Sequence, residues 1–157
     1  MTELDAPQTA QWGPALWTLL HFSVERFGYL SLKRLPHEEQ RIWGGLLASL
    51  RYSLPCPRCK HHYTEYGKLH PIVLEKQALR EWLYYLHSDV NHRIGRESDI
   101  SLSEVEARYK EPFHFSKHCA VVQDQMQRAI RRGIATRNDV QRTLRYLEEL
   151  KRLYDFF

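Results

Sequence analysis

Leu54-Pro55-Cys56-Pro57-Arg58-Cys59 is the stretch around which the chain is organised, and it sets two thiols at the start of a helix. Its first proline favours an extended backbone, and Pro57 fits the first turn of a helix that is predicted to end at Gly67. A helix N-terminus favours the thiolate form of Cys56, and Cys59 lies one turn further on. Such a dithiol suits disulfide exchange, but a Cys-x-x-Cys alone is also compatible with a zinc site.

Length and composition indicate a globular protein with one real core. The chain has 157 residues, 43% of them hydrophobic, and a net charge of +4, which favours acidic partners only weakly. No run of apolar residues is long enough to span a membrane, and the polar start predicts no signal peptide. With only 3 cysteines a disulfide scaffold is excluded, so we expect a cytosolic protein.

Apolar residues recur at helical spacing along most of the chain, and no segment reads as a strand. The first four predicted helices have short connections, one of them at Leu32 to Pro36, which is typical of an antiparallel bundle. The sequence therefore predicts an all-α protein. The expected helices run from Pro14 to Gly28, from Pro36 past Leu50, from Pro57 to Gly67, from Glu75 to Ile94, from Ser101 to before Pro112, from Ser116 to Gly133 and from Thr136 to the end.

A second group of chemically useful side chains lies on the fourth predicted helix. His87 and Asn91 are four residues apart, so they share a face, and Arg96 follows just beyond the helix. A planar ring, an amide and a cation suit a flat, polar ligand that bears phosphate. Each residue also has a simpler structural reading, because buried histidines usually belong to the core and find hydrogen-bond partners there. Trp17 and Trp82 alone would be core aromatics.

Three motifs in order resemble the flavin-dependent sulfhydryl oxidases of the Erv/ALR family. The first is Trp12-Gly13-Pro14-x-x-Trp17-x-x-Leu20-His21, the second is Pro55-Cys56-x-x-Cys59-x-x-His62-Tyr63, and the third is Trp82-x4-His87-x-x-Val90-Asn91-x3-Gly95-Arg96. The resemblance covers residues 12–109. It implies a four-helix bundle that binds FAD. Residues 1–11 form a polar segment before this bundle, and we expect residues 110–157 to form a helical extension that packs on it.

The resemblance also implies a site and a reaction. Cys59 would lie against the flavin, and Cys56 would exchange with thiol-containing protein substrates. Electrons would pass through FAD to dioxygen, giving hydrogen peroxide, and the enzyme would form a homodimer. The implied cofactor-binding residues are Gly13, Trp17, His21, His62, His87, Val90, Asn91, Arg96 and Tyr109.

The sequence departs from the family in several places. Ser88 stands where the family has asparagine, and a structural cysteine pair maps onto Tyr84 and Ser101, so that disulfide is absent. No second Cys-x-x-Cys exists, and residues 110–157 match nothing in the family core. A cysteine-poor version of this kind resembles the members encoded by large cytoplasmic DNA viruses. That likeness implies the host cytosol, and also the virion, as the location.

Two other functions remain as alternatives. A zinc-binding interaction module would use Cys56 and Cys59 with His62 and His70, or with the distant His114, His118 and Cys119. Zinc motifs usually place their second ligand pair closer, so we predict no metal site. The arginines near the C-terminus alternate with acidic residues, which indicates a solvated helix face rather than a nucleic-acid site. Cys119 is interpreted as a small apolar residue packed inward.

Overall fold

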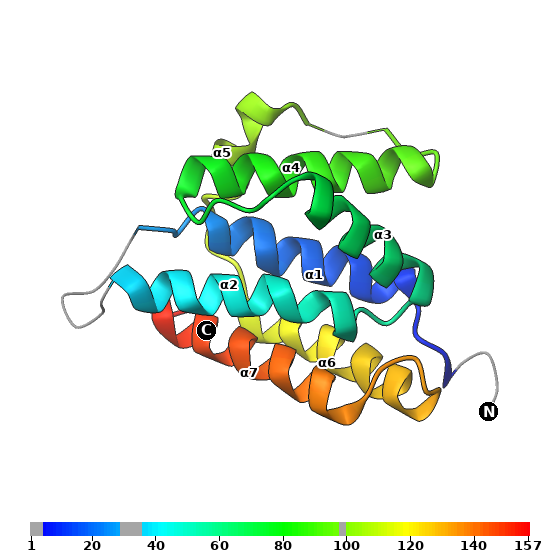
Figure 1. The fold of residues 1–157 in the computed structure, drawn as a ribbon. Coiled ribbons are helices and arrows are strands. Elements are labelled where there is room, and N and C mark those ends of the chain that lie inside the picture. Colours follow the sequence, from blue (N-terminus) through cyan, green and yellow to red (C-terminus); the bar gives the residue numbers. More distant parts are fainter. Residues whose placement is uncertain (1–4, 29–35, 98–99) are drawn as a thin grey trace.

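The computed structural model describes residues 5–28, 36–97 and 100–157, and within these ranges every regular element is a helix (Figure 1). The all-α prediction is confirmed. No helix in the described ranges is both long and apolar enough to span a bilayer. Most of the predicted connector at 32–36, and the first four residues of the N-terminal segment, lie outside the described residues. The elements are α1 (Thr9–Val24), α2 (Pro36–Ser53), α3 (Pro57–Leu69), α4 (Lys76–Arg93), the 3₁₀ turn η2 (Leu102–Glu104), α5 (Val105–Arg108), α6 (Phe115–Arg131) and α7 (Arg137–Leu153).

The helices form three layers, with α1 and α2 in the middle (Figure 1). On one side α4 packs on α1 and α3 packs on α2. On the other side α6 packs on α1 and α7 packs on α2. The two helices of the C-terminal segment, α6 and α7, therefore cover one whole face of the middle layer.

One hydrophobic core runs through all three layers. Leu79 and Leu83 of α4 are fully buried on one side, and Leu147 and Leu150 of α7 are fully buried on the other. The middle layer contributes Leu19, Trp43, Leu46, Leu47 and Leu50. Because the burial is continuous, α6 and α7 share one core with the four preceding long helices.

Two predicted helix starts are wrong. The first helix begins at Thr9, and Pro14 lies inside it rather than in its first turn. The sixth helix begins after His114, whose Nδ1 accepts a hydrogen bond from the Lys117 amide at 3.2 Å, so Ser116 is not its cap. The predicted cap at Thr136 is confirmed, because its hydroxyl accepts from the amide three residues on.

The predicted helix ends are partly right. Gly95 and Gly133 follow α4 and α6 with φ of 75° and 72°, a conformation that other residues rarely adopt. Gly67 does not end α3, which continues to Leu69. The chain leaves the helix before Pro71 instead, because a residue that precedes proline avoids the helical conformation.

The contact between α2 and α7 is very close. A Cβ atom at Gly45 would lie 2.2 Å from Cζ of Tyr146, so a glycine here lets the tyrosine ring rest on α2. At the end of α7 the Tyr154 hydroxyl donates to the buried carboxylate of Glu39 at 2.5 Å and accepts from Trp43 Nε1 at 2.9 Å. Burial and the hydrogen bond to Glu39 raise the pKa of Tyr154. These contacts fix the last helix against the middle layer.

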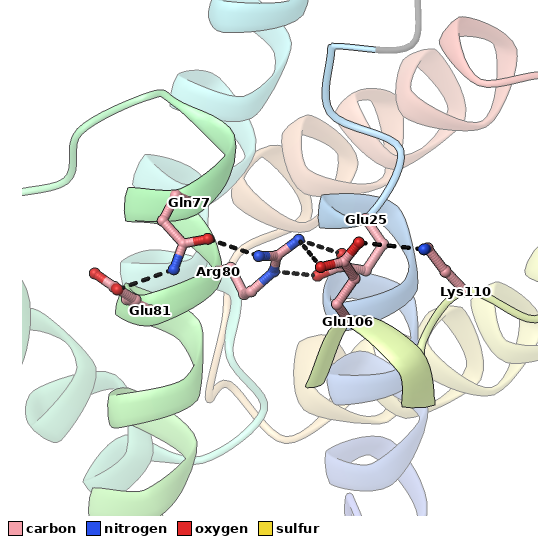
Figure 2. Close-up of polar contacts among 6 residues, drawn as sticks. All are labelled: Glu25, Gln77, Arg80, Glu81, Glu106 and Lys110. Carbon is pink, nitrogen blue, oxygen red and sulfur yellow. Dashed lines mark hydrogen bonds and ion pairs between the residues drawn. The ribbon is translucent and has the colours of Figure 1, made fainter. Parts of the chain in front are cut away.

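Side-chain contacts also tie α5 to the bundle (Figure 2). Arg80 of α4 donates to both oxygens of Glu25, at the end of α1, at 2.8 and 2.7 Å, and lies 3.7 Å from Glu106 of α5. The Tyr84 hydroxyl donates to the Ile100 carbonyl at 3.0 Å. The family's missing disulfide maps onto Tyr84 and the neighbour of Ile100, so a hydrogen bond joins the same two segments here.

Replacing Arg80 with methionine is expected to lower the free energy of unfolding by about 3 kcal/mol, because it leaves a buried carboxylate at Glu25 without its partner. The Glu25 side chain is only 2% exposed. Chemical denaturation measures the change. Lys110→Met is the matched control, because it removes an exposed ion pair with Glu106 and should change the free energy of unfolding far less. Equal losses in the two variants would contradict the structural role of Arg80.

Candidate active site

Two adjoining cavities lie beside α1 and α4. The first, the aromatic cavity, has a volume of about 610 Å³ and reaches to the segment that carries Arg96 and Tyr109. The second, the thiol cavity, has a volume of about 490 Å³ and is lined by Cys59. Gly13, Trp17 and Val90 line both cavities, so the two are neighbours along the same helices. Both volumes are typical of small-molecule sites.

Stacked rings form one wall of the aromatic cavity. Trp17 of α1 and His87 of α4 lie with ring centroids 4.1 Å apart and planes within 6°. His21, one turn after Trp17, stacks on Tyr109 at 4.7 Å and lies 3.0 Å from His87, between Nε2 and Nδ1. Four rings from α1, α4 and the residue after α5 therefore offer flat faces to a ligand.

The His21 imidazole is neutral at physiological pH. Its side chain is almost fully buried, and this burial, together with the neighbouring His87, lowers the pKa of His21 to about 3. A neutral ring has one nitrogen that donates and one that accepts. The close nitrogens of His21 and His87 can therefore share a hydrogen bond rather than repel each other.

Stability is expected to fall as the pH is lowered, because of His21. The unfolded chain has a histidine pKa near ~6.5, above the folded value, so it takes up the proton first. The contribution of neutral His21 to the free energy of unfolding is fully present above about pH 6.5. It falls by about 2 kcal/mol by about pH 5. Denaturation at both pH values measures it. His21→Gln should flatten the dependence, and His92→Gln, at an exposed position, should leave it unchanged; a slope that survives His21→Gln would contradict the assignment.

The two thiols of the Cys-x-x-Cys occupy different positions at the start of α3. Cys56 is the N-cap, and its sulfur accepts a hydrogen bond from the Cys59 amide at 3.2 Å. Cys59 lines the thiol cavity beside apolar side chains such as Leu20 and Leu86. Burial and the hydrogen bond to Cys56 raise the pKa of the Cys59 thiol to about 12. Both cysteines are free in this structure, so this is the dithiol form.

A polar group lines the other side of the thiol cavity. His62, one turn after Cys59, lies with its Nε2 2.5 Å from the Asp89 carboxylate. Arg93 also lines the cavity and lies 3.3 Å from the same carboxylate. Burial alone would raise the pKa of Asp89, but the hydrogen bonds from His62 and Arg93 lower it. Asp89 therefore stays ionised and orients both groups.

The residues that surround the cavities fit a flavin nucleotide. Trp12 lines the thiol cavity, and its buried indole nitrogen has no hydrogen-bond partner in the described part of the protein, so a bound acceptor would satisfy it. A Cβ at Gly13 would meet only Thr9, at 3.9 Å, so packing does not require this glycine and a larger side chain would enter the shared space. Arg96 and Arg108 line the aromatic cavity, where phosphate groups would need cations.

All nine predicted cofactor residues line these cavities. Gly13, Trp17 and Val90 line both, and His62 lines the thiol cavity. The remaining five, His21, His87, Asn91, Arg96 and Tyr109, line the aromatic cavity. Their role in binding FAD stays a prediction.

Other residues that line the cavities were not predicted from the sequence. Trp12 stood at the head of the first motif but was given no role, and Arg93 and Arg108 had no signal beyond their charge. In the described ranges, no three histidine, cysteine or acidic side chains lie close enough together to hold a metal ion.

Comparison with known proteins gives a consistent result. The model of the Erv1 / Alr family matches residues 14–110. The FAD-linked sulfhydryl oxidase of African swine fever virus is 30% identical over 101 residues, which are 64% of this chain and 81% of the relative. The FAD-linked sulfhydryl oxidase ERV1 of Oryza sativa subsp. japonica is 31% identical over 54% of this chain and 42% of the relative. The probable FAD-linked sulfhydryl oxidase R368 of Acanthamoeba polyphaga mimivirus is 30% identical over 55% and 61%. No solved structure matches.

Proposed function

The chain belongs to the Erv1/Alr family and is a flavin-linked thiol oxidase with FAD as its cofactor, and we propose that Cys56 and Cys59 are its redox pair. One observation carries this proposal. Cys59 lines the thiol cavity, which shares Gly13, Trp17 and Val90 with the aromatic cavity. A single ligand that fills both cavities would therefore extend from the thiol to the stacked rings.

The first chemical step is a thiol–disulfide exchange at Cys56. A thiolate of the substrate attacks Cys56 of the oxidised pair, the bond between Cys56 and Cys59 breaks, and Cys59 leaves as a thiolate. The second thiolate of the substrate then attacks the substrate sulfur of the mixed disulfide and releases Cys56 as a thiolate. The substrate leaves as a disulfide, and the enzyme pair has gained two electrons.

The protein's own groups prepare each sulfur for its part. Cys56 caps the helix, is only partly buried and lies outside both cavity linings, so it is the sulfur that we assign to the substrate. Cys59 lies among apolar side chains that disfavour its thiolate, and the charge of Arg58 partly offsets that cost when Cys59 leaves. Bound FAD would supply the two-electron chemistry between the dithiol and dioxygen, with hydrogen peroxide as the product. The stacked rings and Arg96 would hold it.

We propose thiol-containing proteins as substrates and a homodimer as the assembly. Since α6 and α7 cover one face of the middle layer, a second copy would have to use another face, and exposed apolar residues on the α3–α4 side, Leu69, Val73 and Tyr85, support this. Sedimentation of the full chain tests the dimer. We also propose a cytosolic location, in the host cytosol or the virion for a viral protein, supported by the low cysteine content. Imaging of the tagged full chain tests it.

The experiment that tests the proposal combines absorbance with oxygen consumption. The purified protein should be yellow and should consume dioxygen and release peroxide when given dithiothreitol. A colourless protein that binds zinc would instead support the interaction module.

Removing the stacked rings is expected to release the cofactor. Trp17→Ala and His87→Ala should each lower FAD occupancy and the melting temperature, because a ligand that binds only the native state stabilises it. Absorbance and thermal denaturation measure both effects. His61→Ala, at an exposed position on α3, is the control and should stay yellow. If His61→Ala loses FAD and His87→Ala does not, the assignment of the aromatic cavity is wrong.

A further inference from the structure

A third hollow lies away from both cavities and shares no lining residue with them. This groove has a volume of about 480 Å³. Arg51 and Tyr52 line it from the last turn of α2, and Lys60 and His61 line it from α3. The turn between α6 and α7 closes the other side with Ile134 and Thr136.

The groove begins at Lys60, one helical turn after Cys56. Cys56 and Lys60 are joined by the first hydrogen bond of α3, from the Lys60 amide to the Cys56 carbonyl at 3.0 Å. One turn of helix rises ~5.4 Å, which is the length of about two residues of extended chain. The residues next to the cysteine of a substrate held at Cys56 are therefore within reach of this groove.

The groove carries uncompensated positive charge. No carboxylate in the described residues pairs with Arg51 or Lys60, and the Lys60 ammonium donates to the neutral carbonyl of Ile134. The one acidic residue in its lining, Asp139, already accepts a hydrogen bond from Thr136 at 2.8 Å and lies 3.6 Å from Arg142.

Two further features favour a peptide with negative charge. The N-terminus of α7 opens at Thr136 and adds a partial positive charge. The Arg51 guanidinium carbon lies 5.8 Å from the centroid of the half-exposed Tyr52 ring, so the ring supports this cation at the groove.

We propose that this groove docks an acidic segment that flanks the dithiol of the protein substrate. The inference rests on the proposed function and names its substrate class. One wall comes from residues 133–139, which lie outside the family match at 14–110, so the preference belongs to this chain's extension. The acidic side chains lie against Arg51 and Lys60, while the substrate thiolate reaches Cys56.

The test compares two dithiol peptides with the holoenzyme. Both carry the same pair of cysteines, one flanked by glutamates and the other by lysines, and dithiothreitol is the small substrate. Oxygen consumption gives kcat/KM for each. The acidic peptide should react about tenfold faster at low salt, and the preference should shrink as salt screens the charges.

Charge reversal in the groove provides the decisive variant. Arg51→Glu should abolish the preference for the acidic peptide and leave dithiothreitol oxidation unchanged. Arg152→Glu makes the same charge reversal near the far end of α7, ~20 Å from the start of that helix at the groove. This variant should keep the preference for the acidic peptide. Equal rates for the two peptides would overturn the docking groove. So would an Arg51→Glu variant that loses as much dithiothreitol oxidation as peptide oxidation. Absence of dithiothreitol oxidation in the wild type would overturn the proposed function instead.

Discussion

Cys59→Ser should retain bound FAD but lose thiol oxidation by several orders of magnitude, because catalytic groups that act as a unit fail together. The substitution keeps the size of the side chain, so the thiol cavity and its lining stay intact. Without the Cys59 sulfur no disulfide can form with Cys56, and substrate has no bond to attack. Absorbance measures the cofactor, and oxygen consumption with dithiothreitol measures turnover.

The other two cysteines are the comparisons for this variant. Cys56→Ser should be inactive for the same reason and should also stay yellow. Cys119→Ala should keep its activity, since Cys119 packs against the core from α6 and burial raises its thiol pKa. Full turnover in Cys59→Ser, or its loss in Cys119→Ala, would overturn the assignment of the redox pair.

Ending the chain after Gly133 should remove most of the protein's stability. The truncation deletes α7, whose buried residues include Leu147, Leu150 and Leu153. Each fully buried leucine contributes about 1.5–3 kcal/mol, and a typical domain has only ~5–15 kcal/mol in total. The truncated chain should therefore lose the cooperative melting of the full chain and become poorly soluble. Excess FAD should restore part of the transition, because it binds only the folded bundle.

Single substitutions distinguish the contribution of the Tyr154 hydroxyl to stability from that of the last side chain. Tyr154→Phe removes the hydroxyl that joins Trp43 and Glu39, so it should cost about 1–3 kcal/mol by leaving buried polar groups without a partner. Phe157→Ser lies at an exposed position and should change stability by about 0.5 kcal/mol or less.

A melting temperature unchanged by the truncation would show that the extension contributes nothing to the core.

The helices and the cavity linings could be predicted because both depend on spacing along the chain. Side chains three or four residues apart share a helix face, so His87 and Asn91 fall on the cavity side together. The start of α1 could not be predicted, because its cap, Gln8, makes no side-chain capping bond. The His114 cap was missed because Ser116 is a much commoner cap residue.

Contacts between distant segments could not be read from the sequence. Arg80 and Glu25 are ordinary charged residues on two helix faces, and only the packing of α1 against α4 makes them a buried pair. Trp12 had two possible roles, since a buried tryptophan serves a core and a cofactor pocket alike. The groove beside Cys56 needs the turn between α6 and α7, whose position depends on the whole three-layer packing.

The hydrogen bond from Tyr84 to Ile100 has a consequence for how the enzyme matures. A scaffold held by its own disulfide needs an oxidant before it is complete, and a strong reductant can undo it. Here the segment over the aromatic cavity is held by Tyr84 and Arg80, neither of which responds to thiols. A newly made chain can therefore fold and take up FAD in a fully reducing environment. Reductant should then act only on Cys56 and Cys59. Assembly of the enzyme is therefore independent of the thiol–disulfide balance that its own activity changes.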